Sequence, residues 1–234
     1  MPKDQQGKIL YTTSSASPQS GATRKLFQMS KGMKGCGWIT IHVLPADIRG
    51  LYSPENGGGS YYHNLPDIKR DQGLPGYIRF VFDTLRAAMQ LVSIIKREAV
   101  DIVHINEVTD IYAGLATALT SAQCIWHIRA NFSEWPLVSR ILPRIVRVLS
   151  NRIIVVSNSV KEHFFRSQDV SGDKIKVIYD QGPDPARFHP GASTDAIREE
   201  LGIPSEAKIV ALVAKLSERK GHDVFLRAAR KVLV

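Results

Sequence analysis

The sequence contains little cysteine and no long apolar segment. Only two of its 234 residues are cysteine, Cys36 and Cys124, and no spacing of potential ligands matches a metal site. We therefore expect no disulfide scaffold, no bound metal and a reduced, cytoplasmic setting. No stretch of about 18 uncharged apolar residues occurs, so no segment is expected to span a membrane. The first residues, MPKDQQGKILYTT, also lack the apolar run of a signal peptide.

Acidic residues are scarce relative to basic ones. The sequence has 31 Lys and Arg against 22 Asp and Glu, a net charge of +9 that favours an anionic partner. The excess is local: residues 138–152 carry four arginines and no acid, and residues 208–234 carry seven basic residues against two acids. Aromatic residues make up only 8% and form no platform beside the basic segments, so we expect no nucleic acid partner.

Short apolar runs alternate with longer amphipathic stretches, which predicts an α/β fold. We expect six strands, at 9–12, 38–44, 101–106, 124–128, 153–156 and 175–178. We expect helices at 24–33, 77–96, 111–119, 138–149 and 160–165, the last capped by Ser159 with Glu162. A long loop is expected at 50–76. Several strands are continuous apolar runs, which indicates a doubly wound, Rossmann-like parallel sheet covered on both faces.

The pattern changes after residue 179. Residues 180–192 are rich in proline and glycine and are predicted to be a linker after a domain of residues 1–179. A helix near 195–201, a strand at 209–213 and a helix from His222 to the end are expected to follow. These three elements are too few to enclose a core. We therefore expect 193–234 to be the truncated start of a second α/β domain.

Three segments resemble the family-4 glycosyltransferases. They are RIIVVSNSVKEHF at 152–164, KIKVIYDQGPDPARFHP at 174–190 and ELGIPSEAKIVALVAKLSERKGHDVFLRAA at 200–229. The family comprises retaining enzymes of the GT-B fold, which has two Rossmann-like domains. The resemblance implies transfer of a sugar from a nucleotide diphosphate sugar to a hydroxyl acceptor, which is a polysaccharide, a glycolipid or a small molecule. It implies no metal and no further cofactor. The family's acidic pair of glutamates is missing, so we expect the isolated chain to be inactive.

The resemblance also implies a site for the donor diphosphate. Ser20 and Gly21 lie between a strand and a helix, where backbone N–H groups face anionic oxygens. In the family Gly21 would lie beneath the diphosphate and Ser20 near the acceptor. Lys215 and Lys220, with Arg219, match the positions that hold the diphosphate, on which negative charge grows as the glycosidic bond breaks. An ordinary strand–helix turn and a solvated loop are the respective alternatives.

A third group of residues would serve the acceptor. His127 ends an apolar strand at the carboxyl edge of the sheet, where open α/β folds bind ligands. The resemblance implies that it is a catalytic residue whose hydrogen bond orients the reacting centre. The other residues expected at this edge to bind the acceptor are Asn106, Glu107, Arg129 and Asn131. A structural histidine and a solvated loop are the alternatives.

Three arginines fall on one stripe of a predicted helix. Arg140, Arg144 and Arg147 recur at helical spacing beside apolar residues, which suits an anionic membrane surface. A solvated helix face explains the stripe equally well. Two other functional classes stay open: a non-catalytic binding module that uses the acceptor domain or a membrane surface, and a Rossmann oxidoreductase. Against the oxidoreductase, no G-x-G-x-x-G follows the first strand.

Overall fold

The computed structural model contains two compact units, unit 1 (Met1–Gln181) and unit 2 (Gly182–Val234). The structure describes residues 6–17, 20–50, 59–66, 73–129, 136–166, 173–180, 182, 184–186, 188–191 and 195–232. Within these ranges, the side chains of residues 136–138 and Arg219 lie outside the description. The predicted boundaries of the acceptor domain, the linker and the second domain stay a prediction.

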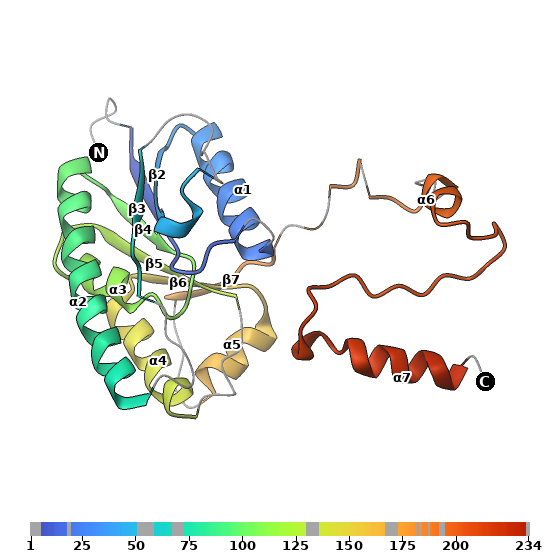
Figure 1. Ribbon diagram of the computed structural model, residues 1–234. Coiled ribbons are helices and arrows are strands. Elements are labelled where there is room, and N and C mark those ends of the chain that lie inside the picture. Colours follow the sequence, from blue (N-terminus) through green and yellow to red (C-terminus); the bar gives the residue numbers. More distant parts are fainter. Residues whose placement is uncertain are drawn as a thin grey trace. The chain divides into compact units, whose positions relative to one another are not determined.

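The described part of unit 1 is built on one sheet of seven parallel strands in the order β3-β2-β1-β4-β5-β6-β7 (Figure 1). The strands are β1 (Lys8–Thr12), β2 (Ile39–Pro45), β3 (Ser60–His63), β4 (Ile102–Ile105), β5 (Gln123–Ile128), β6 (Arg152–Val155) and β7 (Ile175–Val177). This all-parallel order confirms the predicted doubly wound α/β fold.

Helices cover both faces of the sheet, as the continuous apolar strands required. The helices of unit 1 are α1 (Gly21–Gly35), α2 (Gly73–Glu98), α3 (Ile111–Ala118), α4 (Pro136–Leu149) and α5 (Asn158–Phe165). The larger core lies between the sheet and α2 to α5, which contribute residues such as Leu91, Tyr112, Val146 and Phe165 (Figure 1). A smaller core lies beneath α1, where Leu26 packs against Ile9 and Tyr11 of β1.

In unit 1, two local predictions are wrong. β3 lies inside the span predicted to be a loop, where Ser60 pairs with His42 of β2. Each of its residues is half-buried at the edge of the sheet, so the segment lacks the apolar run that marks the central strands. The cap of α5 is Ser157, not Ser159: the Ser157 hydroxyl accepts a hydrogen bond from the Val160 N–H at 3.1 Å.

Unit 2 contains two α-helices in its described residues, α6 (Asp195–Glu200) and α7 (His222–Val232), and a short 3-10 helix at Glu218–Lys220. The strand predicted at 209–213 is wrong, because this segment is irregular and no described strand pairs with it. Val210 and Val213 are accordingly 80% and 95% exposed. None of the described residues of unit 2 is buried, so its apolar side chains do not pack into a core.

No helix among the described residues combines the length and the apolar character that crossing a bilayer requires. Helix α2 is long enough to cross a bilayer, but charged residues such as Arg79, Asp83 and Arg86 interrupt its apolar sequence. Its buried residues lie between Thr84 and Ile95, whereas the large apolar side chains nearer its start are exposed. The observed helix is thus longer than the predicted 77–96, and it is less fully covered than its apolar spacing indicates.

The small core beneath α1 contains an unusual histidine. His42 of β2 is buried, with its ring stacked on Tyr11 at 5.8 Å and tilted against Phe27 at 5.4 Å between centroids. Neither ring nitrogen has a hydrogen-bond partner among the described residues. Because the charged form would lose its hydration, burial lowers the pKa of His42 to about 4. The folded protein therefore holds this imidazole neutral.

We expect the His42→Leu variant to be more resistant to acid. The unfolded chain binds a proton here below about pH 6.5 and the folded protein only below about pH 4, so stability falls as the pH drops through this window. Urea unfolding should show that the variant's advantage grows by about 2 kcal/mol between about pH 7.5 and pH 5. The exposed His189, changed to Leu, is the control. A constant difference between His42→Leu and the parent at both pH values would contradict this account.

Candidate functional site

The carboxyl ends of the central strands form the edge at which a site is expected. β1 pairs with β2 on one side and with β4 on the other, so the chain connections diverge between β1 and β4. Open α/β sheets bind ligands outside the carboxyl ends of the strands at such a point. Asn106 follows β4 and its N–H donates to the Thr12 carbonyl at 3.0 Å, which places it beside the end of β1.

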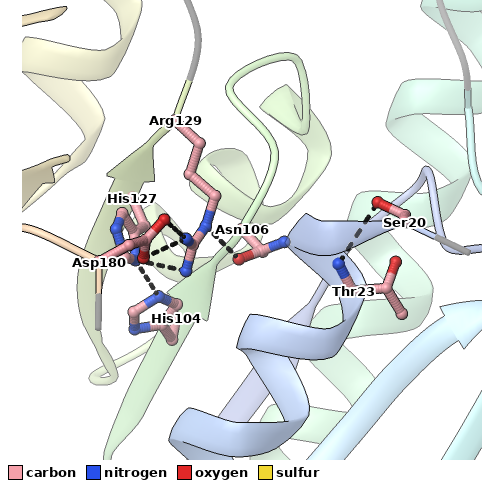
Figure 2. Close-up of polar contacts among 7 residues, drawn as sticks. All are labelled: Ser20, Thr23, His104, Asn106, His127, Arg129 and Asp180. Atoms are coloured by element: carbon pink, nitrogen blue, oxygen red, sulfur yellow. Dashed lines mark hydrogen bonds and ion pairs between the residues drawn. The ribbon is translucent and has the colours of Figure 1, made fainter. Parts of the chain in front are cut away.

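The amino end of α1 lies at this edge and is well ordered by its own residues. Ser20 is the N-cap: its hydroxyl accepts from the Thr23 N–H at 3.5 Å (Figure 2). The Thr23 hydroxyl in turn accepts from the Ser17 N–H at 3.2 Å, which closes the loop before the helix. A Cβ placed on Gly21 would meet no atom within 4 Å, so the first turn borders open space. Such a helix start suits an anionic group.

A buried carboxyl group anchors the loop between β1 and α1. Asp110 is fully buried and accepts hydrogen bonds from the Ser14 N–H at 3.0 Å and from the Ser14 hydroxyl. Tyr112 contacts the same carboxyl at 3.5 Å and shares a 2.7 Å hydrogen bond with Thr12. Burial raises the pKa of Asp110 well above its usual range, and the bonds from Ser14 oppose that rise. The loop that leads to α1 is therefore tied to the start of α3.

Arg129 joins three parts of the sheet edge. Its Nε donates to the Asn106 side-chain oxygen at 3.0 Å, and its Nη1 donates to both carboxylate oxygens of Asp180 at 2.7 and 2.9 Å. Its Nη2 lies 3.3 Å from Nδ1 of His127 (Figure 2). Each nitrogen of the guanidinium thus contacts a protein group. Arg129 lies at the predicted edge, but its contacts are those of a residue that positions its neighbours.

The hydrogen bonds around His127 define its protonation. Nδ1 of His127 lies 3.2 Å from Nε2 of the buried His104 as well as near Arg129 (Figure 2). A guanidinium only donates, so we assign Nδ1 as the acceptor and place the proton of His127 on Nε2. Burial and the charge of Arg129 lower the pKa of His127 to about 3, and burial lowers that of His104 well below its usual range. His127 is therefore a neutral hydrogen-bond donor.

Two of the edge residues carry polar atoms without a partner. Nε2 of His127 and Nδ2 of Asn106 are buried, and neither has a hydrogen-bond partner among the described residues. Buried donors that are left unpaired cost about 1–3 kcal/mol each, so their retention points to a ligand. In Figure 2 the Asn106 amide nitrogen points toward the first turn of α1. The two donors therefore lie on the predicted acceptor side of the site.

A pocket adjoins these residues within unit 1. It has a volume of about 340 Å³ and lies between one face of α1, the carboxyl end of β5 and the segment that follows β7. Its polar lining includes Lys25, His127, Arg129 and Asp180. Pockets that bind small molecules have volumes of about 300–1,000 Å³, so this one is large enough for a small ligand.

The remaining predicted site residues are less closely connected. Glu107 follows β4 at the same edge, where its carbonyl accepts from the Trp126 indole at 3.2 Å. Asn131 lies outside the described residues. Lys215 and Lys220 belong to unit 2, where both are exposed, and the side chain of Arg219 is not described. The grouping of these cations with Gly21 at one diphosphate thus stays a prediction.

The arginine stripe of α4 faces away from the core. Arg140, Arg144 and Arg147 are all exposed, whereas Leu142 and Val146 of the same helix are buried. The helix thus presents its basic residues to the surroundings and its apolar residues to the sheet. This arrangement fits both readings of the stripe, a membrane surface and a solvated face.

Sequence reasoning missed two residues of the cluster. Asp110 looks like an ordinary N-cap before α3, yet its side chain makes no capping hydrogen bond and reaches Ser14 instead. The sequence predicts Asp180 only to be the first residue of the linker. In the structure its carboxylate forms an ion pair with Arg129. Short polar residues at the ends of strands and helices were the only available signal for either one.

Comparison with known proteins was consistent with this geometry. Residues 20–180 match the model of the family described as Glycosyltransferase Family 4. The D-inositol 3-phosphate glycosyltransferase of Corynebacterium aurimucosum is 34% identical over 91 residues, which are 37% of this chain and 21% of that protein. The match thus spans only about a fifth of that relative's length.

Solved structures share the fold. A glycosyltransferase from Rickettsia africae has a TM-score of 0.67 and is 22% identical. The match covers 97% of this chain and 57% of the Rickettsia chain. HepE from Anabaena, solved in complex with UDP and glucose, has a TM-score of 0.66 and is 16% identical. The match covers 96% of this chain and 58% of HepE. The chain thus spans little more than half of either structure.

We expect Asp110 to matter as a hydrogen-bond acceptor, which two variants can test. Asp110→Leu removes the partner of the Ser14 N–H and of the Tyr112 hydroxyl, and should lower the free energy of unfolding by about 2 kcal/mol. Asp110→Asn keeps an acceptor without a buried charge and should cost less than about 1 kcal/mol. Urea unfolding near neutral pH measures both. An equal loss in the two variants would show that the charge itself is needed.

Proposed function

This chain belongs to glycosyltransferase family 4, and we propose that it serves the transfer of a sugar from a nucleotide diphosphate sugar to a hydroxyl acceptor, with retention of configuration. The observation that carries the proposal is the pair of buried, unpartnered donors on His127 and Asn106 beside the start of α1. A relative named for D-inositol 3-phosphate and a structural neighbour solved with UDP and glucose support this class of reaction.

We assign the two sides of the reaction to different parts of the chain. Residues 1–179 would serve the acceptor, 180–192 would link, and 193–234 would begin the donor side. The described residues of unit 2 contain no buried side chain, so its cations are not held in a packed framework. Catalytic electrostatics depend on such preorganisation. We therefore expect this chain alone to bind nucleotide sugar weakly and to transfer no sugar.

On the acceptor side, His127 acts as a donor. Its Nε2–H would hydrogen-bond an oxygen of the transferred sugar or of the acceptor, and Asn106 would donate to a second oxygen nearby. Because His127 is neutral and Nδ1 already faces two donors, it orients the reacting groups and does not remove a proton. Arg129 and Asp180 hold this geometry from behind, which makes them positioning residues.

On the donor side, the leaving diphosphate would meet positive charge. The N–H groups in the first turn of α1, at Gly21, would donate to it, and Lys215 and Lys220 with Arg219 would each supply positive charge. As the bond from the anomeric carbon to oxygen breaks, negative charge grows on the diphosphate. Fixed cations and helix N–H groups stabilise that charge without a metal. Among the described residues, no cluster of His, Cys, Asp and Glu could hold a metal ion.

The diphosphate site can be tested with this chain. We expect UDP to shift the amide NMR signals of Gly21 and Gly221, and the Lys215→Ala/Lys220→Ala variant to bind UDP about tenfold more weakly. The Lys208→Ala/Lys231→Ala variant removes the same charge from unit 2 and should bind as the parent does. Equal losses in both variants would indicate charge attraction alone. Shifts confined to unit 2, or sugar transfer by this chain, would also contradict the assignment.

A surface of unit 1 favours a second role, at an anionic membrane. Between Leu74 and Met89, α2 exposes a stripe of large apolar side chains, with Phe82 at 68% and Met89 at 59% exposed. The other members of the stripe are Leu74, Tyr77, Ile78, Val81 and Leu85. The basic stripe of α4 lies on the same face of the sheet. Helix α3 separates α4 from α2. Apolar side chains flanked by arginines are typical of helices that bind membrane surfaces.

We therefore propose that unit 1 docks peripherally on anionic lipid through α2 and α4, whether or not the chain takes part in sugar transfer. The apolar stripe would enter the interface, and the arginines would contact lipid phosphates. As a non-catalytic membrane-binding module, the chain would keep this property even if nucleotide sugars fail to bind.

Vesicle co-sedimentation tests this surface. We expect the chain to bind vesicles that contain phosphatidylglycerol and not those of pure phosphatidylcholine. Each arginine near an anionic surface contributes about 1 kcal/mol, so Arg140→Ala/Arg144→Ala/Arg147→Ala should weaken binding by at least about tenfold. Changing Lys208, Arg230 and Lys231 to Ala lowers the net charge equally and should have little effect. Equal weakening by both variants would refute a localised docking face.

A further inference from the structure

The pocket in unit 1 presents a mostly apolar surface to a ligand, although five of its ten lining residues are polar or charged: Lys25, Gln28, His127, Arg129 and Asp180. The proposed reaction does not by itself require this apolar surface. Met29 and Met33 of α1 form one wall, and Ile178 and Tyr179 form another. Ile178 and Tyr179 are 52% and 66% exposed, although both are large and apolar. The hydrogen-bonding side chains that line the pocket contribute little of its exposed surface, and a pocket for a sugar alone would expose more of them, so this surface points to a ligand with an apolar part.

The wall contributed by α1 includes a glycine that the fold does not need. Gly32 lies inside the helix, where glycine is less favourable than alanine. A Cβ placed on it would meet no atom within 4 Å, and its φ angle lies outside the left-handed region. Neither packing nor backbone conformation therefore explains the glycine. Its effect is to leave room between Met29 and Met33 on the face that lines the pocket.

One end of the pocket coincides with the acceptor side of the site. His127 lines it, and its Nε2–H is the donor left without a partner among the described residues. A ligand in the pocket would thus extend from a polar end at His127 to an apolar end over the two methionines. Methionine side chains adapt to ligands of varied shape because they are flexible and polarizable.

We propose that this pocket binds an alkyl or aryl portion of the hydroxyl acceptor, so that the acceptor is amphipathic rather than a free sugar or a polysaccharide. The identification of this ligand as the acceptor rests on the proposed function. Its apolar chemistry follows from the pocket alone. Each methylene buried contributes about 0.8 kcal/mol, which is about a fourfold gain in affinity per methylene until the pocket is filled.

Methionine methyl NMR tests the proposal directly. The sequence has only four methionines, at positions 1, 29, 33 and 89. The probe is octyl β-D-glucopyranoside below its micelle concentration, with methyl β-D-glucopyranoside as the polar control. We expect saturable shifts of the Met29 and Met33 methyl signals with the octyl compound only. Met89 is 59% exposed on α2, in the stripe proposed to meet lipid, and reports separately on binding there. The absence of saturable shifts at Met29 and Met33 would overturn the proposal.

A matched pair of glycine variants supplies the second arm. Gly32→Leu should fill the pocket and weaken binding of the octyl compound at least tenfold. Gly35→Leu lies in the same helix, is also open at its Cβ and does not line the pocket, so it should bind as the parent does. The Cβ of neither variant meets an atom within 4 Å, and thermal melts should show no loss of stability. Unchanged binding in Gly32→Leu would also overturn the proposal.

The outcome is independent of the diphosphate test. If the octyl compound binds here and UDP does not bind the chain, the pocket and its ligand class stand, while its assignment to an acceptor falls with the transferase proposal. If UDP binds as proposed and the octyl compound does not, sugar transfer stands and the apolar acceptor is wrong.

Discussion

A single guanidinium holds together the sheet edge on which the site depends. Arg129 donates to Asn106 beyond β4, to His127 within β5 and to Asp180 beyond β7. Its side chain is only 12% exposed, and a cation so well covered is tolerated only when its donors meet acceptors and an opposite charge. The three partners come from separate strands, so the arrangement forms only when the parallel sheet is complete. The geometry of the site is therefore a product of the fold as a whole.

Much of the fold could be predicted because its signals are local. Continuous apolar runs mark the central strands, which are covered on both faces, and helical spacing marks the segments between them. β3 escaped prediction because an edge strand pairs on one side only, and its half-buried residues Ser60–His63 lack an apolar run. The strand at 209–213 failed for the opposite reason. Its apolar run is clear, but a strand needs hydrogen-bonding neighbours, and the described residues supply none.

The site was predictable only as far as strand order allowed. The carboxyl ends of parallel strands meet at one edge, which is why Asn106, His127 and Arg129 could be expected together. Sequence could not indicate that Asp110 would reach Ser14 or that Asp180 would reach Arg129, because both contacts join residues far apart in the chain. The sequence also could not indicate that the guanidinium of Arg129 would contact protein side chains and not a ligand. Whether an arginine binds a ligand or a protein carboxylate depends on tertiary distance, which residue types alone do not encode.

The direction of the hydrogen bonds at His127 limits how protons can move through the site. An imidazole conducts a proton only if one nitrogen accepts while the other releases. Here Nδ1 is blocked by two donors, His104 and Arg129, and Nε2 already carries the ring's proton. The ring therefore offers no free acceptor at Nε2. In the proposed reaction, a proton released by the acceptor hydroxyl would leave with the diphosphate or through solvent, and would not pass into the protein through this histidine.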